Sequence, residues 1–198
     1  MAAWSYVPPS PATPFDDASD ERLMELIHQD DALALRQLMV RYWQPVVAYT
    51  RKILADPDAA ADMAQYTFIK VWQNRAQWIP TGKVGAYIFR IARNAVVNEL
   101  RSRRSRSQLS ESRGRDNFRA SWNPLELLEE KELRSALEQA LHRLPPRRRE
   151  VYLLARDGGL SHVEISEVMG ISPQTVANQM SSAISDLRRY LAGVLEER

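Results

Sequence analysis

The sequence predicts an all-α protein in which two small helical domains are joined by a flexible basic linker. Apolar residues recur three or four positions apart through most of the chain, which is the period of a helix with one buried face. No segment shows the strict alternation of a half-buried strand over a useful length. Two stretches rich in Pro or in Ser and Arg interrupt the helical period. We therefore expect a disordered N-terminal arm at 1–19, helical domains at 20–104 and 124–198, and a linker at 105–123.

The first domain should consist of helices separated by short breaks. The helical period begins near Asp20, and Pro45 lies inside it, where a proline should kink or divide the helix. Asp58 is expected to cap the next helix, which ends before the turn-forming residues 80–82. A further helix begins near Lys83 and continues into an arginine-rich run.

Composition excludes several classes of protein. At 44% hydrophobic and 26% charged residues, the 198-residue chain belongs with globular proteins. It has no Cys, so disulfides, thiolate metal sites and cysteine catalysis are ruled out, and its three His lack ligand spacing. No apolar run approaches the roughly 20 residues of a membrane span, so we expect no direct membrane insertion. Because no catalytic constellation or phosphate loop is present, we expect no catalytic residues, no metal, no cofactor and no enzymatic activity.

The formal net charge of +2 conceals strong segregation along the chain. Residues 1–62 hold 10 acidic and 5 basic side chains, whereas residues 90–119 hold 9 basic and 3 acidic ones. Clustered arginines on one helix attract phosphate, although a charged run can also be a solvated surface. The basic segment is therefore a candidate nucleic-acid contact.

The stretch from Leu160 to Leu191 has the pattern of a helix-turn-helix. Ser161 and Glu164 form a capping-box pair, and Gly170 provides the left-handed exit of a first helix. Ser172 followed by Pro173 then starts a second helix. Its apolar stripe is expected to comprise the residues Val176, Met180, Ile184, Leu187 and Leu191.

The second of these helices would be the one that enters the major groove of DNA. Its outward face presents Gln174, Ala177, Asn178, Ser181 and Ser182. Amide side chains can pair with adenine, and small side chains can contact the thymine methyl group. The alternative is an ordinary helical hairpin whose exposed residues serve only solubility.

Three segments carry a family resemblance through their order and spacing, namely residues 62–72, residues 87–101, and residues 144–151 with 164–166 and 175–176. Together they resemble the extracytoplasmic-function (ECF) sigma factors, which are promoter-recognition subunits of bacterial RNA polymerase. Residues 62–72 resemble the polymerase-binding helix of that family, and residues 87–101 resemble its promoter-melting helix. Residues 144–151, continued at 164–166 and 175–176, resemble its C-terminal DNA-reading domain. The resemblance implies that 20–104 is sigma domain two and 124–198 is sigma domain four.

The resemblance implies that Asp62, Gln65 and Ile69 dock on the clamp helices of the largest polymerase subunit. For the neighbouring Phe68 and Trp72 we favour packing in the protein core.

The resemblance also implies two DNA-binding sets. The loop 77–83 would hold a base flipped out of the non-template strand, where Trp78 either stacks on that base or caps its own domain. The minus-ten set comprises Trp78, Lys83, Arg90, Arg93, Asn94, Asn98 and Arg101, in which Arg93 could instead brace the fold. The minus-thirty-five set comprises Arg147, Arg149, Gln174, Thr175, Ala177, Asn178, Ser181 and Ser182.

These features predict a cytoplasmic alternative sigma factor. It would bind core RNA polymerase through the beta and beta-prime subunits, melt promoter DNA with its first domain and read the upstream element with its second. The family often has an anti-sigma factor as a further partner, so we expect one here. Two alternatives are a helix-turn-helix regulator that acts without joining polymerase and a helical adaptor that does not touch DNA.

Overall fold

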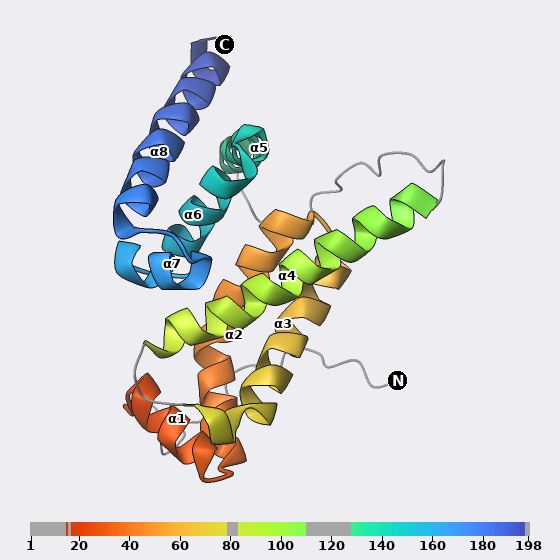
Figure 1. Ribbon diagram of the computed structural model, residues 1–198. Coiled ribbons are helices and arrows are strands. Elements are labelled where there is room, and N and C mark those ends of the chain that lie inside the picture. The colour runs from red at the N-terminus through yellow and green to blue at the C-terminus, as the bar shows by residue number, and fades with distance from the viewer. Residues whose placement is uncertain (1–14, 16, 79–82, 110–127, 197–198) are drawn as a thin grey trace.

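Helices alone make up the regular structure of the described residues, in two groups that pack against each other. The computed structural model describes residues 15, 17–78, 83–109 and 128–196, and within them there is no strand. Figure 1 shows the first group, α1 to α4, beside the second group, α5 to α8. The predicted all-α class is confirmed.

The first group is built around two long helices, α2 and α4. Its elements are α1 (Asp20–His28), α2 (Ala32–Leu54), α3 (Pro57–Gln73), the 3-10 helix η1 (Arg75–Gln77) and α4 (Val84–Leu109). The helical period that begins at Asp20 is divided, but not at Pro45, which lies inside a continuous α2. The break falls at Asp30, which has a φ of 69°, and Asp31 then caps α2 by accepting hydrogen bonds from two backbone amides.

The cap of α3 differs from the prediction. Asp56, rather than Asp58, is the N-cap residue, and its side chain accepts a hydrogen bond from the Ala59 amide at 3.1 Å. Pro57 occupies the first helical position, where its missing amide costs nothing. Asp58 therefore lies in the first turn of α3.

The predicted linker begins too early, because α4 continues to Leu109 instead of ending at Arg104. The Glu99 carboxylate accepts hydrogen bonds from Arg103 at 2.7 Å and from Arg106 at 3.2 Å. Ion pairs along one helix face stabilise a segment whose like charges would otherwise repel one another. Most of the predicted arm and of the predicted linker lie outside the described residues.

The second group contains the helix-turn-helix that was predicted. Its helices are α5 (Leu128–Arg143), α6 (Pro146–Arg156), α7 (His162–Met169) and α8 (Pro173–Glu196). Ser161 and Glu164 form both bonds of a capping box, and Gly170 has a φ of 65°. One residue of the predicted α8 stripe is misplaced, since Ile184 is exposed and the neighbouring Ala183 is buried.

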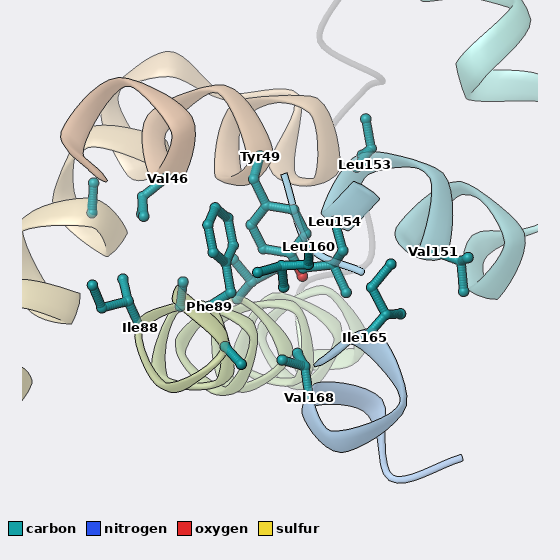
Figure 2. Close-up of a cluster of buried hydrophobic side chains, with 14 of the residues drawn as sticks. Val46, Tyr49, Ile88, Phe89, Val151, Leu153, Leu154, Leu160, Ile165 and Val168 are labelled. Carbon is teal, nitrogen blue, oxygen red and sulfur yellow. The ribbon is translucent and has the colours of Figure 1, made fainter. Parts of the chain in front are cut away.

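The buried side chains of the two groups form one continuous cluster (Figure 2). Tyr49 of α2 and Phe89 of α4 meet edge to face, with 5.7 Å between ring centroids. From the second group, Leu154 and Leu160 belong to the same cluster. The two groups therefore share apolar surface in addition to their separate cores.

Candidate protein and nucleic-acid interfaces

Helix α3 presents an exposed stripe on the side away from the core. Asp62, Gln65 and Ile69 are all exposed, and Ile69 leaves 45% of its surface accessible. On the other side of α3, Phe68 is buried and stacks on Trp43 at 6.0 Å, while Trp72 is half-buried against the core. The expectation that Phe68 and Trp72 serve packing is confirmed, and the three predicted contact residues share one solvent face.

Two further side chains with apolar surface are exposed, one on α3 and one on α2, and the sequence patterns did not single them out. Tyr66 of α3 is 43% exposed beside Gln65, and Lys70 lies over its ring at 5.4 Å. Val40 of α2 is 51% exposed, one turn before the Trp43 that stacks on α3. The available signal was an apolar residue out of register with the buried stripe of its helix.

Helix α4 separates the predicted minus-ten residues into two faces. Arg90, Asn94, Asn98 and Arg101 are exposed and recur three or four positions apart, so they line one side of the helix. Arg93 points elsewhere, since its Nε donates a hydrogen bond to Glu150 Oε1 of α6 at 2.9 Å. The structure thus brings four of these residues together and gives the fifth the bracing contact considered as its alternative.

The remaining minus-ten residues flank a segment that the structure does not describe. Trp78 is half-buried and packs against the hydrophobic cluster, as a side chain that caps its own domain would. Lys83 is exposed at the start of α4. Part of the predicted base-holding loop, residues 79–82, lies outside the described residues.

The outward side of α8 carries adjacent amides and hydroxyls. Gln174 Nε2 donates a hydrogen bond to Asn178 Oδ1 at 3.1 Å, and the hydroxyls of Ser172 and Thr175 lie 2.8 Å apart. The exposed members of the predicted set are Gln174, Thr175, Asn178 and Ser181, whereas Ala177 and Ser182 are half-buried. Because each amide keeps further donors or acceptors, this side of α8 can read base edges.

The three arginines at the start of α6 have different surroundings. Arg147 is exposed, whereas Arg148 forms an ion pair with Asp186 that ties α6 to α8. Arg149 is half-buried and lies 3.2 Å from His142 Nδ1, and burial lowers its pKa. Burial and the adjacent Arg149 charge likewise lower the pKa of His142. Arg147 is therefore the most accessible of the three for a phosphate contact.

Two family models match the chain, and their residue ranges contain the exposed sides of α3, α4 and α8 described above. Residues 38–106 match the model described as sigma-70 region 2, and residues 134–187 match sigma-70, region 4. The protein belongs to the ECF sigma factors. In this sigma factor, the region 2 match runs from within α2 through α3 to near the end of α4, and the region 4 match includes α7 and the first part of α8.

Curated relatives support this assignment. The chain is 25% identical over 165 residues to "RNA polymerase sigma factor SigZ" of Bacillus subtilis, covering 80% of this chain and 88% of that protein. It is 27% identical to "ECF RNA polymerase sigma factor BldN" of Streptomyces coelicolor, covering 90% and 69%. It is 26% identical to the "RNA polymerase sigma-H factor" of Pseudomonas aeruginosa, covering 90% and 96%.

Solved structures share the fold of this sigma factor. CnrH, in complex with the cytosolic domain of CnrY, gives a TM-score of 0.67 at 21% identity and covers 88% of this chain and 97% of its own. RpoE from Bartonella quintana, in complex with the anti-sigma factor NepR, gives a TM-score of 0.69 at 21% identity, covering 79% and 96%.

Two further findings concern the described part of this sigma factor. None of its helices is long and apolar enough to cross a membrane. Within the same residues, no group of three or more His, Asp or Glu side chains is placed to hold a metal ion.

Proposed function

We propose that this ECF sigma factor contacts core RNA polymerase through the exposed stripe of α3 and promoter DNA through the outward sides of α4 and α8. The observation that carries the proposal is the side of α4 on which Arg90, Asn94, Asn98 and Arg101 lie together in solvent. Arginines at this spacing can bind successive phosphates, while the amides between them can bind base edges. The protein acts as a transcription initiation factor, and polymerase performs the catalysis.

The two ends of α4 would divide the work of promoter opening. Lys83 directly precedes α4, and Trp78 comes before it in the chain. We propose that these two residues help to hold an unstacked base of the non-template strand. Beyond Arg101, α4 continues for two turns through an arginine-rich segment. Phosphate contacts of this kind fix the position of the strand without reading its sequence.

The helix-turn-helix would bind duplex DNA at the minus-thirty-five element, upstream of the segment that α4 contacts. The exposed amides of Gln174 and Asn178 face the major groove in this proposal, and Arg147 approaches the backbone. Since Arg148 is held by Asp186, it serves the packing of α6 on α8 rather than DNA.

Likeness of fold to RpoE, solved with the anti-sigma factor NepR, supports an anti-sigma factor as a further partner. Because polymerase and promoter DNA are its other partners, we place the protein in the cytoplasm.

The polymerase-binding role of α3 can be tested with a double substitution. We expect Asp62→Ala with Gln65→Ala to weaken binding of core polymerase about tenfold or more, since both polar side chains project from the proposed contact. Affinity for labelled full-length protein would be measured by titration with core polymerase, followed by run-off transcription at saturating protein.

The matched control is Glu25→Ala with Gln29→Ala, which removes similar residue types from exposed positions at α1. It should bind core polymerase as the unmodified protein does. Equal affinity of the α3 variant and the unmodified protein would refute this assignment of the polymerase contact.

A further inference from the structure

We propose that Arg75 is a positioning residue for the minus-ten site, because it fixes the segment that leads from α3 into the base-holding loop 77–83. This proposal rests on the proposed function, in which Trp78 and Lys83 help to hold an unstacked base. Arg75 is the first residue of η1, and the sequence patterns did not single it out. It acts through Trp78 and does not itself touch DNA.

The Arg75 side chain joins the end of α3 to the turn between α1 and α2. Its Nε donates a hydrogen bond to Asp30 Oδ1 in that turn, and its Nη1 donates one to the Trp72 carbonyl oxygen at 2.9 Å. The guanidinium carbon also lies 4.3 Å from the centre of the Trp72 ring, where the electrons of the ring attract the cation. These contacts hold the guanidinium group in one place.

The Arg75 backbone determines where the chain goes next. Its carbonyl oxygen accepts a hydrogen bond from His28 Nδ1 at 3.0 Å and another from the Trp78 amide at 3.4 Å. Trp78 follows in an extended conformation, with a φ of −68° and a ψ of 129°, and its half-buried side chain packs against the hydrophobic cluster. The direction in which the chain enters the base-holding loop is therefore set by α1 and α3 through Arg75.

Asp30 is poorly suited to stabilising the fold, although it receives Arg75. Its side chain is 69% exposed, and ion pairs at such exposed positions contribute little to the free energy of unfolding. Asp30 also has a φ of 69°, a left-handed conformation that glycine adopts more readily than any residue with a Cβ. Backbone outliers of this kind cluster at functional sites. Glycine would serve stability better at this position, so the carboxylate points to a requirement for the geometry of Arg75.

A site that holds an unstacked base depends strongly on fixed geometry. Taking a base out of the stack costs free energy, and the site offsets this cost only if its side chains are already in place. A charged contact with phosphate is less sensitive to small displacements, because the attraction between charges falls slowly with distance. Loss of the Arg75 contacts should therefore weaken recognition of the base and leave the phosphate contacts of α4 in place.

Base discrimination by the holoenzyme tests this role. Core polymerase and the full-length protein would be combined with promoter fragments whose minus-ten non-template strand is unpaired, and each base of that strand would be replaced in turn by an abasic residue. We expect the unmodified holoenzyme to bind about tenfold more weakly when the held base is missing. With Arg75→Ala, the same replacement should weaken binding about twofold or less, because the site is no longer in place.

Asp30→Gly separates a positioning role from a loss of stability. Glycine removes the carboxylate that receives Arg75 but suits the left-handed backbone, so the thermal midpoint should change by no more than about 2 °C. Base discrimination should nevertheless fall. The double variant Asp30→Gly with Arg75→Ala should lose no more discrimination than Arg75→Ala alone, because both changes remove the same contact.

Arg22→Ala is the matched control, since it removes an exposed arginine that pairs with Glu25 inside α1. It should leave base discrimination unchanged. Neither Arg75→Ala nor Asp30→Gly should change affinity for core polymerase or for a duplex fragment that carries only the minus-thirty-five element. An equal loss of affinity for core polymerase and for every fragment would show that Arg75 only stabilises the fold, and would refute the proposal.

Failure of the positioning role and failure of the proposed function give different results. If the unmodified holoenzyme binds equally well whichever base is removed, the base-holding part of the proposed function is refuted, and the role of Arg75 with it. If the unmodified holoenzyme discriminates and both Arg75→Ala and Asp30→Gly discriminate equally well, only the role of Arg75 is refuted and the proposed function stands.

Discussion

At the scale of single residues, two glycines of the second group illustrate different reasons for having no side chain. Gly170 has a φ of 65°, and no neighbouring atom lies within 4 Å of the place a Cβ would take, so its requirement is conformational. A Cβ on Gly158 would instead lie 2.5 Å from the Leu154 carbonyl oxygen and 3.1 Å from Phe89, so its requirement is space.

We expect Gly170→Ala to lower the free energy of unfolding by about 1–2 kcal/mol, which is the cost of left-handed backbone for a residue with a Cβ. Gly158→Ala should cost more, because either the backbone or the Phe89 ring has to move. Urea denaturation of both variants provides the comparison. Equal losses would show that the space around Gly158 is not restrictive.

The N-cap residue Asp56 should give the protein an acid-sensitive contribution to stability. The hydrogen bond from the Ala59 amide, supported by Arg103, holds the pKa of this carboxyl below its ordinary value despite partial burial. The ionised form therefore stabilises the fold above the unfolded pKa of about 4, and this stabilisation is lost as the pH falls through the lower, folded value.

We expect Asp56→Asn, which keeps a capping oxygen but lacks the charge, to be less stable by about 0.5–1 kcal/mol at pH 6. The difference from the unmodified protein should shrink as the pH falls below 4. Thermal denaturation across this range provides the measurement, and a difference that stays constant with pH would contradict the role given to the charge.

Among the candidate site residues, those on the outward side of α4 could be placed from the sequence alone. The spacing of Arg90, Asn94, Asn98 and Arg101 is a local property of the sequence, so it could be read without a structure. The position of Arg93 depends on Glu150, which is 57 residues away, and no local pattern reports such a partner.

At the scale of elements, the helix-turn-helix was predictable because each of its signals is contiguous in the chain. The capping box of α7, its glycine exit and the Ser-Pro start of α8 lie between Ser161 and Pro173. The end of α4 was missed because arginine and serine suggested a linker, whereas Glu99 holds two of the arginines along the helix.

The capping box of α7 provides the prediction for this scale. Ser161 accepts a hydrogen bond from the Glu164 amide at 3.3 Å, and Glu164 accepts one from the Ser161 amide at 2.8 Å. We expect Ser161→Ala to lower stability by about 1 kcal/mol. Adding Glu164→Ala should cost less than the sum of the single losses, because the two bonds support one turn.

Chemical denaturation of the two single variants and the double variant would measure this coupling. Glu167→Ala, an exposed substitution on the same helix, is the control and should stay within about 0.5 kcal/mol of the unmodified protein. Strictly additive losses would show that the two bonds act independently.

At the scale of the whole molecule, the shared apolar cluster links the stability of the two groups. Tyr49 and Phe89 belong to one group, and Leu154 and Leu160 to the other, yet all four lie in the same buried cluster. The sequence could not predict this contact, since its members are far apart in the chain and each also fits the helical pattern of its own group.

We expect heat unfolding of the full-length protein to occur as a single cooperative transition, because neither group can unfold without exposing the apolar surface of the other. Two well-separated transitions in the unmodified protein would contradict the energetic linkage.

The bond between Arg93 and Glu150 also bears on how promoter binding responds to salt. If Arg93 leaves Glu150 for a DNA phosphate on promoter binding, one anion replaces another as its partner, and the released Glu150 carboxylate attracts a cation from solution. DNA binding normally gains free energy by releasing condensed cations, with a slope of about −0.9 per phosphate neutralised. One such release would then be offset, so the sigma factor would bind its promoter with a shallower salt dependence than its count of DNA-facing cations implies.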